Sequence, residues 1–254
     1  MPVAIVGHRG ARGEAPENTL ASFQLAIDAG VPEIELDVRL SSDGHLIVLH
    51  DKDVDRTTTV RGGAQKYTLA ELSVMDARRN TPGWHRTTPI PALADVVDMC
   101  PPDMRFQFEV KRASRHLMHQ KAARIKKLID ERDLYERVVV TSSSSTFLRM
   151  MRTTSDRVQL GYVCQYRYMQ PLRRADALRC DWVILHHSLA TESLIRRAHR
   201  RRMGVSVWTV NDLTTAEKLL TLGVDSIITD YPSAFMTHFA QRALRSTMAA
   251  QGSP

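Results

Sequence analysis

The chain has 254 residues and a formal net charge of +7, with 35 lysines and arginines against 28 aspartates and glutamates. Its hydrophobic share of 43% and charged share of 25% are those of an ordinary globular protein, which excludes fibrous and disordered classes. No apolar run approaches the ~18 residues that a membrane span needs, so we expect no stable membrane insertion.

The cysteines and the N-terminus bear on the compartment. Cys100, Cys164 and Cys180 are odd in number and far apart, which argues against a disulfide framework and a cysteine zinc site and fits a reducing environment. The opening segment MPVAIVGHRG has neither a basic stretch nor a small-residue cleavage site, so nothing in it supports secretion. We therefore expect a cytoplasmic protein.

The basic surplus gathers in arginine clusters at 78–79, 173–174 and 196–202. Such charge fits nucleic acid, an anionic membrane surface or an anionic substrate. A solvated surface is the favoured interpretation, because charge patches alone discriminate poorly. We expect no nucleic-acid partner.

Apolar, β-branched runs alternate with helical patterns along the chain. The predicted strands are Val3–Gly7, Ile34–Val38, Leu46–Leu49, Phe106–Val110, Val138–Thr141, Val158–Tyr162, Trp182–Leu185, Val205–Val210 and Ser226–Thr229. The predicted helices are Thr19–Ala29, Leu69–Asp76, Leu93–Met99, His116–Arg132, Thr146–Arg152, Pro171–Leu178, Thr191–Arg202 and Thr214–Leu222. Asn18 before the first helix and Gly30 after it are boundary signals. Repeated strand–helix units at this length predict a parallel barrel or a doubly wound sheet.

The turn Ser41-Ser42-Asp43-Gly44 decides between these folds. It is too short to connect parallel neighbours, so Leu46–Leu49 must fold back on Ile34–Val38 as an antiparallel hairpin. The eight remaining strands then close a (β/α)8 TIM barrel. The hairpin also returns His50 toward Glu35 and Asp37.

Residues 51–90 interrupt the alternation. They are polar, carry two glycine-rich turns and make a connection far longer than a compact barrel needs, which is typical of a functional insertion. We expect one TIM-barrel domain over residues 1–254, with a small insertion at about 51–90 that lies over the barrel mouth. The last residues, AAQGSP, are expected to be a frayed tail.

Acidic residues cluster at the predicted carboxyl ends of the strands, where barrel enzymes place their chemistry. Glu35 and Asp37 are two positions apart on one strand and so share its inner face, and Glu109 follows the same pattern on the next barrel strand. Three carboxylates with no nearby cysteine favour a hard cation, Mg²⁺ or Ca²⁺. The alternative is a buried structural network with Arg9 and Lys111.

Two histidines, His8 and His50, reach the same mouth and are the natural proton carriers at neutral pH. Either one alone is as readily a hydrogen-bonded core histidine. Together with a cation, Arg9 and Lys111, they describe a site for a phosphate ester.

Six segments in this order resemble the glycerophosphodiester phosphodiesterase family across residues 4–232. They are HRGARGEAPENTLASFQLAIDAG, EIELDVRLSSDGHLIVLHD, DRTT, FEVK, VWTVND and GVDSIITDYP. The family has a (β/α)8 barrel with a small insertion after its second histidine. The chain departs from the family pattern at Ser142–Ser145 and His186–His187, so we expect differences in the leaving-group pocket.

The resemblance implies a role for each matching residue. The acid and base histidines match His8 and His50, with His50 as base the favoured order, although the order stays open. Divalent metal ligands match Glu35, Asp37 and Glu109. Residues that bind substrate match Arg9, Lys111, Asn18 and Trp208. Helix capping is the alternative for Asn18, and a buried core position is the alternative for Trp208.

The implied reaction is metal-dependent hydrolysis of a glycerophosphodiester to glycerol 3-phosphate and an alcohol. By family analogy, the glycerol 2-hydroxyl attacks first and water then opens a cyclic phosphate. The expected partner is a small anionic phosphodiester, and the expected state is a monomer or homodimer. One alternative is a lysophospholipase D-type enzyme with an apolar groove built from residues 51–90 and Trp84. Another is a non-catalytic module that binds phosphorylated ligands or nucleic acid.

Overall fold

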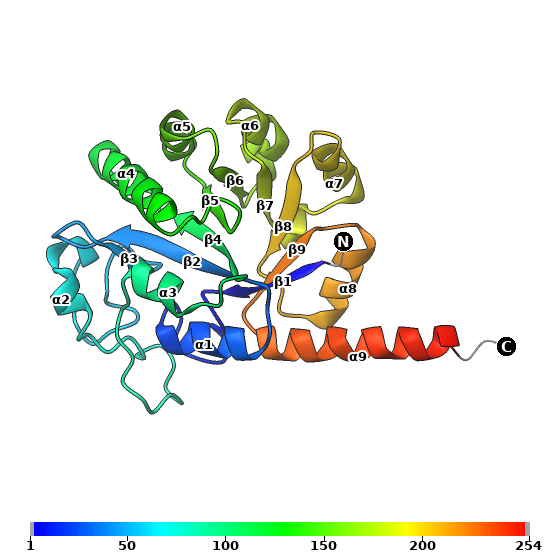
Figure 1. Cartoon of the computed structure of the whole chain (residues 1–254), viewed down its shortest axis with the longest axis horizontal. Coiled ribbons are helices and arrows are strands. Elements are labelled where there is room, and N and C mark those ends of the chain that lie inside the picture. Colours follow the sequence, from blue (N-terminus) through cyan, green and yellow to red (C-terminus); the bar gives the residue numbers. More distant parts are fainter. Residues whose placement is uncertain (1–2, 252–254) are drawn as a thin grey trace.

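The computed structural model describes residues 3–251 (Figure 1). Its strands are β1 (Ala4–His8), β2 (Glu33–Leu40), β3 (Leu46–Val48), β4 (Arg105–Val110), β5 (Val138–Ser142), β6 (Gln159–Cys164), β7 (Trp182–His186), β8 (Gly204–Trp208) and β9 (Ser226–Thr229). Its α-helices are α1 (Leu20–Asp28), α2 (Leu69–Leu72), α3 (Leu93–Met99), α4 (Arg115–Glu131), α5 (Ser145–Thr154), α6 (Pro171–Ala177), α7 (Glu192–His199), α8 (Leu213–Thr221) and α9 (Pro232–Gln251). Short 3₁₀ turns lie at Ala64–Lys66, Arg167–Met169 and His187–Leu189. No helix within the described residues is both long and apolar enough to cross a bilayer.

The parallel strands close into a barrel. Their order is β1-β9-β8-β7-β6-β5-β4-β2, and β1 pairs with β2 to complete the ring. β3 pairs antiparallel with β2, with Val38 opposite Val48. The predicted (β/α)8 barrel and the added hairpin are therefore confirmed, and the hairpin places the end of β3 beside the mouth.

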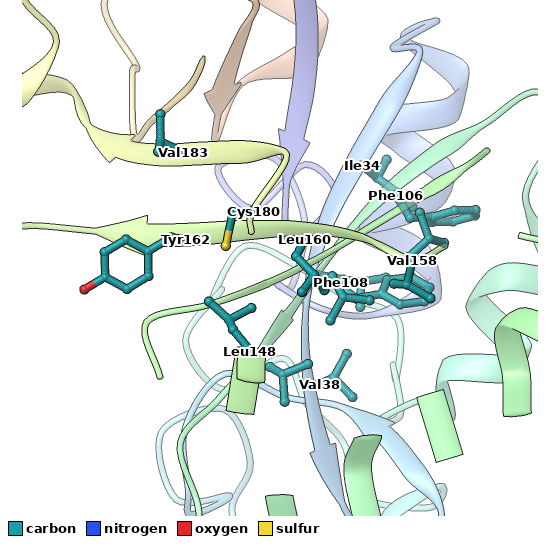
Figure 2. Close-up of a cluster of buried hydrophobic side chains, with 14 of the residues drawn as sticks. Ile34, Val38, Phe106, Phe108, Leu148, Val158, Leu160, Tyr162, Cys180 and Val183 are labelled. Atoms are coloured by element: carbon teal, nitrogen blue, oxygen red, sulfur yellow. The ribbon is translucent and has the colours of Figure 1, made fainter. Parts of the chain in front are cut away.

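The alternation along β2 and β4 sorts polar from apolar side chains. Ile34, Leu36 and Val38 point outward and join the large core between barrel and helices, together with Phe106 and Phe108. Figure 2 shows part of this layer, where helical Leu148 packs near strand residues. The opposite faces of the same strands carry the acids, so burial of the outer face fixes the register that aims them inward.

Residues 51–90 build a second, smaller core beside β3. Its buried members are Ile47, Leu49, Val54, Ala64, Leu72, Met75, Ala77 and Ile90. The apolar side chains of the insertion are thus used to fold the insertion itself. Three of its polar residues, Asp51, Arg56 and Asn80, contact His50 or Glu17 beside the barrel mouth.

The C-terminal segment differs from the sequence expectation. The structure forms α9 from Pro232 to Gln251, with Phe235 buried in the core, and Figure 1 shows this helix beginning next to one end of α1 and extending away from it, past the barrel. The expected frayed tail was wrong for residues 249–251, which are helical, whereas 252–254 lie outside the described residues. Docking of the first turns on the barrel gives the helix a base from which its later turns extend.

Candidate active site

A cavity of about 490 Å³ opens at the carboxyl ends of the barrel strands. One part of its wall holds six of the predicted residues, which are His8, Arg9, Glu35, His50, Glu109 and Lys111. Trp208 lines it as well. The volume is within the range that suits a whole small ligand, so the cavity has room for more than a phosphate group.

Glu35, Asp37 and Glu109 converge as the strand pattern predicts. One carboxylate oxygen from each lies within 4.8 Å of the others. Oε1 of Glu35 is buried and has no hydrogen-bond partner among the described residues. Burial, followed by repulsion from Asp37 and Glu109, raises the pKa of Glu35 well above its ordinary value. These oxygens fit a hard divalent cation, whose charge would satisfy the unpaired oxygen.

Two cationic side chains bracket this cluster. Lys111 Nζ lies 2.8 Å from Asp37 Oδ1 and 2.7 Å from Glu109 Oε1. Arg9 Nε lies 3.2 Å from Asp37 Oδ2, and the Arg9 backbone amide donates to Glu35 at 3.0 Å. Burial opposes ionisation of Asp37, but Lys111 and Arg9 hold its pKa well below the ordinary value. Asp37 is therefore charged, whereas burial and repulsion disfavour the charged form of its neighbour Glu35.

The ion pairs around the cavity form one connected network. Its carboxylates are Glu17, Glu35, Asp37, Asp51, Glu109 and Asp230, and its permanent cations are Arg9, Arg12, Arg56 and Lys111. Arg39 adds a further cation that acts on Asp37, Asp51 and Glu109. Burial and repulsion from the neighbouring acids disfavour the charged form of Glu35, and a divalent cation at this point would favour it.

His8 is held by a partner from the far end of the chain. Its Nδ1 lies 2.5 Å from Oδ1 of Asp230, and Asn211 donates to the other oxygen of Asp230 at 2.8 Å. The contact places the ring proton on Nδ1 and leaves Nε2 free to face the carboxylate cluster, 3.9 Å from Glu35. Burial lowers the pKa of His8, and the Asp230 hydrogen bond opposes that shift.

His50 is held by the residue that follows it. Its Nδ1 lies 2.7 Å from Oδ1 of Asp51, whose other oxygen accepts from Arg56 at 2.5 Å. Arg56 also binds buried Glu17 with two 2.7 Å contacts, and Arg9 donates to Glu17 at 2.7 Å. These ion pairs link Asp51, which holds His50, to Arg9, which follows His8.

Asn18 and Trp208 both lie at the site, and Trp208 also packs against a small apolar cluster of Val6, Val163, Ile184 and Ile228. Asn18 donates from Nδ2 to Asp37 Oδ2 at 2.8 Å, while Thr19 is the residue that caps α1. The helix-cap interpretation of Asn18 was therefore wrong. Trp208 is half-buried on the cavity wall, and its Nε1 has no acceptor within the described part of the chain.

Some features of the site escaped sequence reasoning. The supporting acids Glu17, Asp51 and Asp230 had no assigned role in the sequence analysis, although Asp51 directly follows His50 and Asp230 directly follows the last predicted strand. The far wall of the cavity comes from the connection between β6 and α6, with Gln165, Tyr166, Tyr168 and Met169. The apolar groove expected from residues 51–90 and Trp84 is not part of this wall, because Trp84 is hydrogen-bonded to Thr88 within the insertion.

Comparison with known proteins agrees with the geometry. The model of the glycerophosphoryl diester phosphodiesterase family matches residues 8–234. A glycerophosphodiester phosphodiesterase of Caldanaerobacter subterraneus subsp. tengcongensis is 30% identical over 239 residues, covering 93% of this chain and 97% of its own.

Two solved structures share the fold. A putative glycerophosphoryl diester phosphodiesterase from Silicibacter pomeroyi has a TM-score of 0.84 at 24% identity and covers 91% of this chain and 92% of its own. An Oleispira antarctica phosphodiesterase in complex with the product sn-glycerol-3-phosphate has a TM-score of 0.82 at 26% identity, covering 93% and 96%. The chain belongs to the glycerophosphoryl diester phosphodiesterase family of enzymes.

Proposed function

We propose that this enzyme hydrolyses glycerophosphodiesters to glycerol 3-phosphate and an alcohol, with one divalent cation and two histidines. The observation that carries the proposal is the placement of three convergent carboxylates and two carboxylate-paired imidazoles in one cavity. The solved relative that holds sn-glycerol-3-phosphate supports the choice of substrate.

Glu35, Asp37 and Glu109 would hold the cation, which we propose to be Mg²⁺ or Ca²⁺ because all three donors are carboxylate oxygens. A cation there supplies Lewis-acid stabilisation of the phosphate oxygens and lowers the pKa of an attacking hydroxyl. Asn18 fixes one ligand, since its side chain donates to Asp37 Oδ2 and accepts from the Asp37 backbone amide.

Arg9 and Lys111 bind the phosphodiester. Both are cationic, largely buried and on the cavity wall, so their charge is weakly screened by solvent. Guanidinium and ammonium donors bind non-bridging phosphate oxygens, and they offset charge that grows in the transition state.

His8 and His50 move the protons. In each ring, Nδ1 donates to a carboxylate, so Nε2 is the nitrogen that is left to accept or donate the transferred proton. We propose that the glycerol 2-hydroxyl gives its proton to one ring and attacks phosphorus. The other ring then protonates the departing alcohol, and water opens the resulting cyclic phosphate in a second step. His50 as base is the order that we favour.

Trp208 would pack against the glycerol part. Its indole lines the cavity, and its Nε1–H is buried without an acceptor, so a substrate hydroxyl that reaches it would supply the missing partner. Placement in the cytoplasm, a single domain over residues 1–254 and a monomeric or dimeric state remain predictions.

The test is product analysis with several glycerophosphodiesters and a lysophospholipid, each with Mg²⁺, Ca²⁺ or EDTA. We expect glycerol 3-phosphate from the deacylated substrates in the presence of a cation. Release of lysophosphatidate from the acylated substrate at a higher rate would favour the lysophospholipase D-type alternative instead.

A further inference from the structure

The cavity carries positive charge that the proposed chemistry does not use. Arg112 follows β4 and Arg174 lies on α6, and both line the same cavity as the two histidines. Neither forms an ion pair with a described residue, and Arg174 has only a 3.4 Å contact with the Tyr162 hydroxyl. Arg9 and Lys111, by contrast, are paired with carboxylates.

No further acid among the described cavity-lining residues compensates for the two arginines. Among the described residues that line the cavity, the only carboxylates are Glu35 and Glu109, which belong to the proposed metal cluster. The remaining polar groups near the rim, Ser143 and Gln165, are neutral. The outer part of the cavity therefore presents uncompensated positive charge to whatever enters it.

Two tyrosines from the connection between β6 and α6 line the same cavity. Tyr166 and Tyr168 are 48% and 75% exposed. Their rings stack on one another with centroids 5.4 Å apart and planes 8° from parallel. Rings that cover each other form no cage for a quaternary ammonium group, and the neighbouring arginines would repel one. Their hydroxyls remain available as hydrogen-bond donors.

We propose that Arg112 and Arg174, with the Tyr166–Tyr168 pair, form a leaving-group subsite that favours an alcohol carrying a second phosphate. The inference rests on the proposed function, since it assigns the glycerophosphate part to the histidine end of the cavity. The volume of about 490 Å³ leaves space for such an alcohol beyond the scissile phosphate. Guanidinium groups bind phosphate oxygens with paired hydrogen bonds, which gives selectivity as well as affinity.

The test compares glycerophosphoinositol with glycerophosphoinositol 4-phosphate, which differ only in the second phosphate. We expect kcat/KM to be about 10-fold higher for the phosphorylated substrate, mainly through KM, and this preference to disappear in Arg112→Gln/Arg174→Gln. The double variant should keep its kcat/KM for glycerophosphoinositol. The control Arg200→Gln removes an exposed, unpaired charge after α7, at the other end of the barrel. It should leave kcat/KM unchanged for both substrates.

Equal or lower kcat/KM for the phosphorylated substrate, or equal losses on both substrates in the double variant, would overturn the proposal. A binding measurement separates it from the proposed function. Calorimetric titration of inositol 4-phosphate needs no turnover, and we expect tighter binding than for inositol and loss of that difference in the double variant. Absence of turnover on every substrate would refute the proposed function, while the titration would still decide on the subsite.

Discussion

The imidazole of His8 and the carboxylate of Asp230 meet at 2.5 Å although 222 positions separate them in the chain. Pairing of β1 with β9 brings them together, because Gly7 lies opposite Thr229 in that register. A carboxylate on Nδ1 fixes the tautomer and stabilises the protonated ring, so Asp230 is a positioning residue for His8. Asp51 has the same relationship with His50.

This relationship predicts a way to order the two histidines. Asp230 raises the pKa of His8, so Asp230→Asn should lower it and move one limb of the pH profile of kcat/KM to lower pH. Movement of the acidic limb would identify His8 as the base, and movement of the alkaline limb would identify it as the acid. Asp51→Asn should move the other limb.

Both substitutions should also reduce kcat by about 10²-fold or more, because the ring loses its orientation. Asp212→Asn is the matched control, since Asp212 only caps α8 through Thr215. If both limbs and kcat in Asp230→Asn match those of the wild type, the positioning role is refuted.

Substitution of Glu35 should have opposite effects on the thermal stability of the metal-free and the metal-bound protein. Because the pKa of Glu35 is raised in the folded protein, the folded state loses stability as the pH rises above the ordinary pKa of glutamate. Glu35→Gln should therefore raise Tm in EDTA, by about 2–4 °C for each kcal/mol relieved. The same variant should lose most of the stabilisation by cation, which for the wild type is about 2.7 kcal/mol at 100-fold excess over Kd.

Glu33→Gln provides the control for this thermal measurement. Glu33 is on the same strand and inner face and is also buried, but its carboxylate accepts from Gln107 rather than facing the cluster. It should keep the full Tm response to Mg²⁺ or Ca²⁺. An equal response in Glu35→Gln would remove Glu35 from the ligand set.

Lys121 predicts a pH-dependent contribution to stability from behind the site. It is buried on α4 and donates to the backbone oxygen of Lys111 at 2.8 Å, and burial lowers its pKa to about 7. The unfolded chain then binds more protons than the folded one between pH 7 and about 10.5, so stability rises across that window.

In Lys121→Met this increment, up to roughly 4 kcal/mol, should be missing from urea unfolding measured from pH 6 to 10. Lys127→Met changes an exposed position on the same helix and should keep the wild-type slope. If the stability of wild type and of Lys121→Met depends on pH in the same way, folding does not lower the pKa of Lys121.

Trp208 predicts a specific loss of substrate affinity. Trp208→Phe keeps an aromatic ring but removes the unpaired Nε1–H, so we expect KM to rise about 5-fold with kcat nearly unchanged. Trp182→Phe is the control, because its Nε1 already donates to Gln159 outside the cavity wall. An unchanged KM in Trp208→Phe would exclude a hydrogen bond to substrate.

The sequence was sufficient for features that follow from local periodicity. The two-residue repeat in β2 predicts that Glu35 and Asp37 share the inner face, and the structure places both there with Glu109. The short turn after Leu40 predicts the hairpin that returns His50 to the mouth. Both are consequences of strand geometry, which is a local property.

Contacts made by closure of the barrel were not accessible in the same way. The Asp230 carboxylate reaches His8 only when the last strand pairs with the first. Glu17 joins Arg9 to Arg56 only because the insertion folds on a core of its own beside β3. Stacking of Tyr166 on Tyr168 depends on a loop conformation that no period specifies. The contact partners of these side chains are set by tertiary packing, so the sequence alone does not predict which residues pair.

The roles of the two histidines and the cation are tested most directly by release of glycerol 3-phosphate from wild type, His8→Ala and His50→Ala, each with Mg²⁺, Ca²⁺ or EDTA, with unfolding curves for every variant. His116→Ala, an exposed change on α4, is the control. We expect turnover by the wild type and the control only with a cation, and losses of at least about 10²-fold in both site variants at unchanged fold. Wild-type turnover that persists in EDTA would refute the need for a cation, and a folded His8→Ala or His50→Ala variant with near-normal kcat would refute the role of that histidine.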